Sequence, residues 1–496
     1  MADFMEDLRL LIRSWHPIIT IETEEEQRTL DRVLQTVKSL ALPAYVWDLV
    51  QALRPAPPAL PQPVPQTAKP QQVLAHILTL EEPGVYVLAD LCTHLGDATV
   101  QRLLRTFAHL APQRRQTIIL IDPIVNLPAG LARLAVPLEI SLPDEAQLEQ
   151  IVRETYQNLS RYSKLRTELK REHFQHILRT LRGLTAQEAR LAISRVILDD
   201  DCLSTDDLDR LLEVKREMVR EGGLLEYIEA GINLDDLGGL GNLKRWLAKR
   251  AGALSPEARE FGLEPPRGVL LLGVQGCGKS AACKAVAAAW KMPLLKLDPG
   301  QLYDKYVGES ERNLRKAIKQ AESMAPVVLW IDEIEKAFAS AAAESADGGL
   351  SKRMFGTLLG WMQEHRSPIF TVATANDISA LPPELVRKGR FDEVFFVDLP
   401  DAETRATIFA IHLRKRKRDP AQFDLGALAG ASEGFSGAEI EQAIVGALYT
   451  AFGQKRSLAQ EDILNELRVT RPLSVILAEK IAALRIWAAD RWVPAD

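Results

Sequence analysis

The chain has 496 residues, of which 47% are hydrophobic and 26% charged, and its formal net charge at pH 7 is -6. These ordinary globular values exclude wholesale disorder and a membrane protein, and the mild acidity gives no global reason to expect nucleic-acid binding. At about 150 residues per domain, the length corresponds to three or four domains. The N-terminus is acidic where a signal peptide is basic, and no run of about 18 apolar residues occurs. We therefore expect a soluble protein of a reducing compartment with no membrane segment.

Residues 1–140 alternate short apolar runs with polar stretches long enough for helices. The apolar runs are residues 18–21, 44–47, 85–89 and 117–121. Runs of this kind, separated by segments such as 24–40 and 97–110, predict a parallel sheet covered by helices. Seven prolines between residues 55 and 70 predict an exposed, polyproline-like loop inside this domain. The loop is either a plain surface insertion or a ligand for a proline-recognition module.

The apolar period becomes helical from residue 141 to about residue 222. Two groups of apolar residues carry it: Leu148, Ile151 and Val152, and then Leu191, Ile193 and Val196. This period predicts a small all-helical domain. Glu221-Gly222-Gly223 then supplies a break, after which a second cycle begins.

The second cycle begins at residues 234–239 and then contains an apolar run that breaks into glycines, residues 268–280. The spacing from Gly273 to Gly278, Lys279 and Ser280 fits the pattern GxxxxGK[ST]. In that pattern backbone N–H groups wrap phosphates, the lysine reaches the terminal phosphates and the hydroxyl holds Mg²⁺. The run predicts a buried strand, a phosphate-binding loop and a helix start, with a glycine-rich turn that binds no ligand as the alternative.

Two later apolar runs end in polar side chains that suit phosphate chemistry. Residues 327–331 precede Asp332 and Glu333. The first acid can hold Mg²⁺, and the second can polarise the water that attacks the γ-phosphate. Residues 369–375 precede Asn376, whose amide can hydrogen-bond both that phosphate and that water. Without the earlier motifs, an asparagine at this place is a turn former.

Two arginines, Arg387 and Arg390, follow the strand that ends at Asn376. The planar guanidinium stays protonated and binds phosphate oxygens in pairs, so arginine suits the charge that develops in phosphoryl transfer. The pair lies too far along the chain to serve its own phosphate loop easily. We therefore expect these arginines to reach a nucleotide in a neighbouring subunit, with surface salt bridges as the alternative.

The second cycle repeats the first. Leu142-Pro-Asp-Glu-Ala matches Leu399-Pro-Asp-Ala-Glu, and the segment from Gly183 matches the segment from Gly434. The first copy has no GxxxxGK[ST], and Asp90 is followed by leucine rather than by a second acid. We infer a tandem duplication whose first half has lost the nucleotide chemistry, with chance similarity of helical segments as the alternative. The expected domains are a degenerate α/β domain (1–140), its helical lid (141–222), an ATPase α/β core (223–398) and a second lid with C-terminal helices (399–496).

Six motifs in order resemble the AAA ATPase module, the group that includes katanin, spastin and FtsH. They are Asp236-Leu-Gly238-Gly239, Gly273 to Ser280, Asp332-Glu333, Asn376, Arg387-Lys-Gly-Arg390-Phe-Asp and Gly434-Phe-Ser-Gly437-Ala438. The resemblance spans about residues 232 to 445. It implies an α/β P-loop NTPase fold with a parallel sheet and a helical lid, ATP and Mg²⁺ as cofactors, and a homo-oligomeric ring, most often a hexamer.

The resemblance also implies roles for single residues. Glu333 would be the catalytic acid-base residue and Asn376 the first sensor, while Arg387 and Arg390 would act in trans. Ser280 and Asp332 would hold Mg²⁺. The residues that bind the nucleotide would be Asp236, Gly238, Gly273, Gly276, Cys277, Gly278, Lys279, Ser280, Ala281, Gly437 and Ala438.

A segment before the next expected helix resembles the pore loop of AAA rings. Ser310 is expected to cap a helix that runs from Glu311, which leaves the preceding residues on a loop. In AAA rings an aromatic-aliphatic-glycine triplet at this place lines the central pore and grips an extended polypeptide. The resemblance therefore implies a pore loop formed by Lys305, Tyr306 and Val307, with simple packing of the tyrosine under the loop as the alternative.

The sequence departs from the family pattern inside the phosphate loop. Val274, Gln275 and Cys277 stand where proline and threonine are usual, but Lys279 and Ser280 are intact. The whole order of an inactive half, a proline-rich insertion and one active module also resembles the uncharacterised AAA ATPase family of cyanobacteria and algal plastids. That resemblance implies a cytoplasmic or stromal location.

Three functional hypotheses follow. The leading one is a ring ATPase that remodels or unfolds a protein substrate through a central pore. The second is a nucleic-acid-associated ATPase that uses the basic run Arg414, Lys415, Arg416, Lys417 and Arg418, which is otherwise a solvated helix end. The third is a switch that binds ATP to control assembly and translocates nothing.

Overall fold

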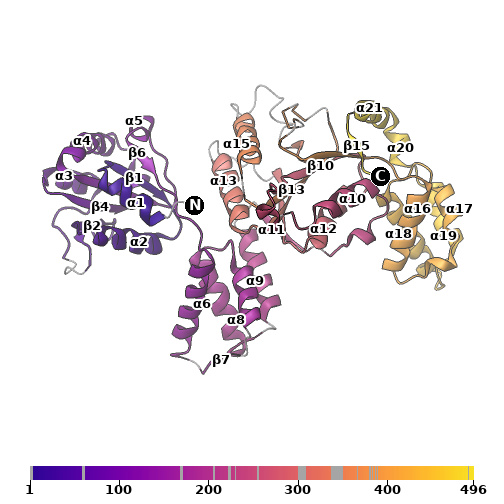
Figure 1. Ribbon diagram of the computed structural model, residues 1–496, viewed down its shortest axis with the longest axis horizontal. Helices are drawn as coiled ribbons and strands as arrows, with labels where there is room; N and C mark the ends of the chain where they lie inside the picture. Colours follow the sequence, from indigo (N-terminus) through magenta and orange to yellow (C-terminus); the bar gives the residue numbers. More distant parts are fainter. Residues whose placement is uncertain are drawn as a thin grey trace. The chain divides into compact units, whose positions relative to one another are not determined.

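The computed structural model in Figure 1 describes residues 4–57, 62–162, 164–167, 171–204, 207–221, 225–229, 231–253, 256–299, 309–336, 350–365, 367–378, 381–382, 384–385, 387, 389–489 and 491–496. The chain forms two compact units. The first comprises Met1–Asn158 with Thr185–Leu191, and the second comprises Leu159–Leu184 with Ala192–Asp496. Among the described residues, no helix is both long enough and apolar enough to cross a membrane.

The first unit is built on a sheet whose described strands follow the order β3-β2-β4-β5-β1-β6. The strands are β1 (Ile18–Glu22), β2 (Ala44–Trp47), β3 (Arg54–Pro55), β4 (Gly84–Ala89), β5 (Gln116–Asp122) and β6 (Ala135–Pro137). Neighbouring strands pair in parallel, except that β3 is antiparallel to β2. The four apolar runs predicted for this domain are therefore confirmed as strands of one mainly parallel sheet.

Helices cover both faces of this sheet. They are α1 (Phe4–Arg13), α2 (Glu26–Ser39), α3 (Pro70–Thr79), η1 (Leu91–His94), α4 (Ala98–Arg114) and α5 (Ala129–Ala132). Ile118 and Leu120 of β5 belong to the core under α3 and α4, whereas Ile119 and Ile121 belong to the core under α1 and α2. Figure 1 shows these two helix pairs on opposite sides of the strands. Because both faces are buried, the strands are continuous apolar runs rather than alternating ones.

The proline-rich segment agrees with the prediction only in part. Its described residues between 62 and 66 are exposed or half-buried, but Thr67 is 1% exposed. The Trp47 indole N–H donates to the Thr67 carbonyl at 2.7 Å, and the Leu53 N–H donates to the Thr67 hydroxyl at 3.1 Å. The segment thus returns to the core before Pro70 begins α3, a first helical position that suits proline.

Along the chain, a helical region follows β6 and precedes the second sheet. It contains α6 (Glu145–Leu159), β7 (Arg166–Thr167), α7 (Arg171–Leu181), α8 (Ala186–Asp200), β8 (Cys202–Leu203) and α9 (Asp207–Glu221). It is helical as predicted, apart from the short parallel pair β7–β8. Leu191, one of the apolar residues that indicated the helical period, is 55% exposed, whereas Ile193 and Val196 are buried. Two residues along a helix rotate by about 200°, so Leu191 and Ile193 face opposite sides. Of the predicted break, residues 222 and 223 lie outside the described residues.

The second unit contains the larger sheet, with the described strand order β15-β14-β10-β13-β12-β11-β9. The strands are β9 (Leu225–Ile228), β10 (Gly268–Gly273), β11 (Leu294–Leu297), β12 (Val327–Ile331), β13 (Ile369–Ala375), β14 (Glu393–Val397) and β15 (Val493–Pro494). Pairing is parallel except between β11 and the edge strand β9. The predicted P-loop NTPase sheet is confirmed.

Helices again cover both faces of the larger sheet. The helices of this core are η2 (Leu234–Asp236), α10 (Gly241–Arg250), α11 (Pro256–Glu260), α12 (Lys279–Ala289), α13 (Glu309–Ser323) and α15 (Leu350–Glu364). Leu270 and Leu272 of β10 pack with residues of α13 and α15, whereas Val269 and Leu271 pack with residues of α10 and α12. Because α13 begins at Glu309, Ser310 lies inside the helix, and its expected position as the residue before the helix is wrong.

The helical lid follows the sheet. It contains α16 (Ala402–Lys415), η4 (Pro420–Gln422), α17 (Leu425–Ala431), α18 (Gly437–Gly453), α19 (Gln460–Val469), α20 (Leu473–Ile476) and α21 (Ala478–Ala488). Helices α16, α17, α18 and α19 share one buried core, to which they contribute Phe409, Leu428, Ile440 and Ile463, respectively. The predicted sheet domain with a helical lid is therefore present in full.

The two sheets correspond strand by strand. In chain order, β1, β2, β4, β5 and β6 take the same sheet positions as β10, β11, β12, β13 and β14. Each sheet also ends on an antiparallel strand, although β3 follows β2 in the chain while β9 precedes β10. This shared order supports the inferred duplication on grounds independent of the sequence matches.

Candidate active site

The phosphate loop connects β10 to α12 and lies against two other elements. Gly273 has a φ of 146°, and a Cβ there would meet the Val397 carbonyl oxygen of β14 at 2.0 Å. Gly276 has a φ of 79°, and a Cβ there would meet the Ser436 hydroxyl at 2.8 Å. Glycine alone fits both positions, because it adopts these angles readily and brings no side chain. The loop is therefore held between the sheet and the start of the lid helix α18.

Lys279 is buried in this loop at 6% exposure. Its Nζ donates to the carbonyl oxygens of Gly273 at 2.8 Å and Val274 at 2.7 Å. Burial lowers the pKa of Lys279 to about 8, and the nearby carboxylates of Glu335, Glu333 and Asp332 oppose that shift. Among the described residues the ammonium thus has only neutral acceptors, and a nucleotide phosphate would offer it charged ones.

The lowered pKa predicts that ATP affinity falls above pH 8. Below that pH Lys279 is charged in the free protein, whereas above it ATP binding must take up a proton, because phosphate restores the charged form. We expect the Kd of a nonhydrolysable ATP analogue to rise by about tenfold per pH unit above pH 8. Calorimetry in buffers of different ionisation enthalpy measures both the Kd and the proton uptake. Lys279→Arg should show no such slope, and a flat wild-type profile from pH 7 to 9.5 would contradict the prediction.

The acidic residues predicted after β12 meet the end of β13. The Thr374 hydroxyl donates to Asp332 Oδ1 at 2.8 Å and accepts from the Glu333 N–H at 3.0 Å. Asn376 Nδ2 donates to Glu333 Oε1 at 3.0 Å. These contacts exist because β12 and β13 are parallel neighbours whose carboxyl ends share one edge of the sheet. The structure thus brings Asp332, Glu333 and Asn376 together as the sequence predicted.

Glu333 has a strained backbone. Its φ is 47°, a left-handed value that non-glycine residues adopt rarely and at a cost of order 1–3 kcal/mol. The bond from its N–H to Thr374 and the bond from Asn376 to its carboxylate hold it there. The strain turns the carboxylate toward the end of β13.

Glu335 is a residue of this cluster that the sequence reasoning missed. It is 8% exposed, and its Oε1 accepts from the Asn376 N–H at 2.8 Å. Its Oε2 has no partner among the described residues, and burial raises the pKa of this carboxyl. Glu335 therefore fixes the main chain of Asn376. Thr374 was missed as well, although its position two residues before Asn376 places it on the same face of β13.

Two lysines pair with the acidic residues. Lys296 of β11 lies with its Nζ 3.0 Å from Asp332 Oδ2 and 4.7 Å above the Trp330 ring. Lys336 pairs with Glu333, and that hydrogen bond raises the pKa of Lys336. Each acid of the strand end is thus neutralised from within the chain. Neither lysine was singled out in the sequence. The pair of Lys296 with Asp332 depends on the register of β11 and β12, whereas Lys336 and Glu333 are three residues apart in one turn.

The lid contributes the predicted residues Gly437 and Ala438. The Ala438 N–H donates to the Gly276 carbonyl at 3.0 Å, so the first turn of α18 touches the phosphate loop directly. The Ser436 hydroxyl and the Glu439 side chain form a capping box that fixes this turn. On the other side, a Cβ on Gly238 would lie 2.5 Å from Ile408 Cγ1 of α16, so the predicted Asp236–Gly239 loop also meets the lid.

The remaining predicted loop residues differ in exposure. Ser280 is exposed in the first turn of α12, and Ala281 is half-buried behind it. Cys277 is half-buried, and burial raises the pKa of its thiol to about 12. A thiol with that pKa stays protonated at neutral pH and reacts slowly with oxidants. This supports Cys277 as a small loop residue rather than a redox switch.

The predicted arginines, Arg387 and Arg390, bond to their own loop and not to the phosphate loop in the described part of the chain. The Arg387 N–H donates to the Glu384 carbonyl at 3.3 Å, and the Arg390 guanidinium donates to the same carbonyl. Across the described part of the chain, no hydrogen bond joins either guanidinium to Lys279 or Glu333. The predicted pore residues Lys305, Tyr306 and Val307 lie outside the described residues.

Comparisons with known proteins match this geometry. The model of the ATPase family associated with various cellular activities (AAA) matches residues 269–399. Models of the N-terminal and second domains of SpoVK-like AAA ATPases match residues 4–140 and 146–222. The uncharacterized AAA domain-containing protein ycf46 of Guillardia theta is 36% identical over 98% of this chain and 95% of that protein.

The chain belongs to the AAA ATPases, in the ycf46 group. The Pyropia yezoensis ycf46 protein is 36% identical over 98% of both chains. Outside that group, the AAA ATPase is similar to the proteasome-activating nucleotidase of Aeropyrum pernix, at 34% identity over 42% of this chain and 51% of that protein. As an AAA ATPase the chain binds and hydrolyses ATP.

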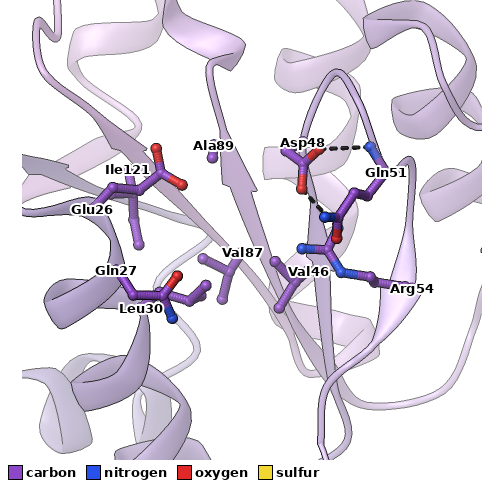
Figure 2. Close-up of a pocket in the computed structure, with 10 residues that line it drawn as sticks. All are labelled: Glu26, Gln27, Leu30, Val46, Asp48, Gln51, Arg54, Val87, Ala89 and Ile121. Atoms are coloured by element: carbon purple, nitrogen blue, oxygen red, sulfur yellow. Dashed lines mark hydrogen bonds and ion pairs between the residues drawn. The ribbon is translucent and has the colours of Figure 1, made fainter. Parts of the chain in front are cut away.

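In the first unit of this AAA ATPase, the loop after β1 corresponds to the phosphate loop after β10 but contains different residues. Thr23, Glu24 and Glu25 replace the glycine loop between β1 and α2. A pocket of about 170 Å³ lies at the ends of β2, β4 and β5 (Figure 2). Its lining is Glu26, Gln27, Leu30, Val46, Asp48, Gln51, Arg54, Val87, Ala89 and Ile121.

This pocket is acidic. Burial raises the pKa of Glu26, and the neighbouring carboxylates of Asp90 and Asp48 raise it further. Among the described lining residues Arg54 is the one basic side chain, and its guanidinium lies 2.7 Å from Asp48. Negative charge at this edge disfavours a phosphate ligand.

Proposed function

We propose that this AAA ATPase hydrolyses Mg-ATP at sites shared between neighbouring copies in a ring, and that the cycle remodels a protein substrate. The cluster of Lys279, Asp332, Glu333 and Asn376 carries the hydrolytic part. Similarity to a proteasome-activating nucleotidase supports a protein substrate. Relatives from Guillardia theta and Pyropia yezoensis support a plastid-stromal or cytoplasmic location.

The residues present fit a magnesium ion. The Ser280 hydroxyl is exposed at the start of α12, and the Asp332 carboxylate is only 23% exposed and already fixed by Thr374. Both are hard oxygen donors of the kind Mg²⁺ prefers. We infer that Ser280 and Asp332 hold the ion, which supplies positive charge to the phosphates when bound. In its absence Lys296 balances the charge of Asp332.

The chain's own residues perform three tasks in hydrolysis. Lys279 exchanges its bonds to the Gly273 and Val274 carbonyls for bonds to phosphate oxygens. Glu333 accepts a proton from the attacking water at its carboxylate. Asn376 orients that carboxylate through its amide, and Glu335 in turn holds the main chain of Asn376.

A mixing experiment tests whether the site is shared. Glu333→Gln disables its own subunit's base but keeps Arg390, whereas Arg390→Ala keeps the base and lacks the finger. Each variant alone should be inactive. If Arg390 acts in trans, an equal mixture should restore up to about a quarter of wild-type ATPase. A working site needs an Arg390→Ala subunit, which has the base, beside a Glu333→Gln subunit, which has the arginine, and each occurs with a probability of about one half.

The matched control replaces an arginine that has no assigned role at the nucleotide. Arg468→Ala, on the exposed face of α19, should be active alone. Absence of any recovery in the Glu333→Gln and Arg390→Ala mixture, with mixed oligomers verified by native mass spectrometry, would contradict a shared site.

The nucleic-acid alternative gains no support from the described contacts. Arg416 of the basic run is half-buried and pairs with Glu441 at 2.8 Å, so part of this run serves the packing of α16 against α18. The other four basic residues are exposed around the end of α16.

A further inference from the structure

Helix α10 begins without a capping side chain of its own. The residue before it is Leu240, which has a φ of 60° and forms no side-chain hydrogen bond. The first backbone N–H groups of a helix have no acceptor inside the helix, and a polar side chain usually satisfies one of them. A leucine cannot do so. The acceptors must therefore come from elsewhere in the chain.

They come from residues 495 and 496. The Gly241 N–H donates to Asp496 Oδ1 at 3.1 Å, 255 positions away in sequence. The N–H groups of Asn242 and Leu243 donate to the Ala495 carbonyl at 2.9 and 3.2 Å. All three leading amides of α10 are thus satisfied by one short segment, and its carboxylate also suits the positive end of the helix dipole.

This capping segment is fixed to the strand beside the phosphate loop. Val493 and Pro494 pair in parallel with Phe395 and Phe396 of β14. The Ala495 N–H donates to the Phe396 carbonyl at 2.9 Å, and Ala495 is 2% exposed. On its other edge β14 pairs with β10, which leads into the phosphate loop. The position of residues 495–496 is therefore set by the same sheet that sets the loop.

The Gly238–Gly239 pair is enclosed by this segment and the lid. A Cβ on Gly239, whose φ is 67°, would lie 2.8 Å from both carboxylate oxygens of Asp496 and 2.8 Å from Thr404 Cγ2 of α16. Gly238 meets Ile408 of the same helix. Two elements therefore converge on the two glycines: helix α16 and the capping segment, which contributes the carboxylate of Asp496.

We propose that Asp496 and Ala495 are positioning residues for ATP: by capping α10 in cis, they hold the Asp236–Gly239 loop where it receives the adenine ring. The inference rests on the proposed assignment of Asp236 and Gly238 to the nucleotide. Loss of the cap frees the first turn of α10, and the loop joined to that turn moves with it. The phosphate and hydrolytic residues are untouched, so affinity for the base changes while the chemical step does not.

The test uses Asp496→Ala in the full chain with ATP and GTP as probes. We expect KM for ATP to rise by about fivefold, the worth of one lost helix cap, with kcat within about twofold of wild type. The preference for ATP over GTP should fall by a similar factor. Asp496→Asn keeps an acceptor for the Gly241 N–H and should restore most of the affinity. The Asn242 side-chain amide donates to the carbonyls of Pro494, at 3.0 Å, and Asp496, so Asn242→Ala loosens the same junction and should also raise KM.

The matched control is Asp424→Ala. Asp424 is also exposed and also caps a helix, since its Oδ1 accepts from the Ala427 N–H at 3.0 Å at the start of α17. This variant should lose a comparable amount of stability in thermal melts and keep the wild-type KM.

Three outcomes separate this inference from the proposed function. If the wild type hydrolyses ATP through Lys279 but Asp496→Ala keeps the wild-type KM and base preference, the inference fails and the function stands. If Asp424→Ala raises KM as much as Asp496→Ala does, the effect is general destabilisation and the inference also fails. If Lys279→Ala hydrolyses ATP as the wild type does, the proposed site itself is wrong.

Discussion

Glu333→Gln is expected to lower kcat for ATP by about 10²- to 10³-fold while ATP still binds. Glutamine keeps an oxygen that accepts from Asn376 Nδ2, so the geometry of the strand end survives. It cannot take the proton of the attacking water. Steady-state ATPase rates and calorimetric ATP binding measure the two effects separately. Glu364→Gln, an exposed acid at the end of α15, serves as the control and should behave as wild type.

The same variant reveals the substrate, since it stays in the ATP-bound state. Trapped with ATP in native extract, Glu333→Gln should retain a protein client that the wild type releases. Adding Tyr306→Ala to the trap should reduce the captured client without weakening ATP binding, because a pore tyrosine grips polypeptide rather than nucleotide. Equal capture by both traps would favour an assembly switch over a translocating ring. Normal turnover by Glu333→Gln would remove the catalytic assignment altogether.

Local chemistry explains what the sequence reveals of this molecule. The strands β1, β2, β4 and β5 were predicted because strands buried on both faces are uninterrupted apolar runs. The phosphate loop was predicted because Gly273, Gly278, Lys279 and Ser280 must stand at a fixed spacing for the chemistry to work. Both signals lie within a few consecutive residues, so a single sequence contains them whole.

Long-range pairing explains what the sequence hides. Glu335 holds Asn376, and Lys296 pairs with Asp332, only because β11, β12 and β13 are neighbours in a particular register. The strand β15 is only two residues long and lies far from β14 in the sequence. Its residue Pro494 pairs with Phe396, which precedes it by 98 positions. Leu191 contributes to the helical period but is 55% exposed, because a run of adjacent apolar residues leaves the buried face of a helix undecided.

Lys279→Ala is expected to weaken ATP binding by at least about 100-fold and to reduce hydrolysis to background. The ammonium is buried beside the loop carbonyls, so no neighbouring cation can replace it without rebuilding the loop. Lys291→Ala removes an exposed lysine just beyond α12 and is the charge-matched control. Filter binding and ATPase assays, with thermal melts to verify folding, measure the outcome.

The prediction that Lys279→Ala abolishes hydrolysis requires that the first unit has no second site for a nucleotide. A duplicated fold offers a second place for a nucleotide, and residual hydrolysis in Lys279→Ala at more than a few per cent of wild type would point there. The described contacts argue against it, because Glu24 and Glu26 are exposed at the edge that corresponds to the phosphate loop and would repel a phosphate. Glu25 is already committed to Arg28 at 2.6 Å and to the Gln187 N–H at 2.9 Å. The first unit has a sheet of matching strand order, but the acidic residues at this edge disfavour a phosphate ligand, so we expect hydrolysis by the whole chain to depend on Lys279.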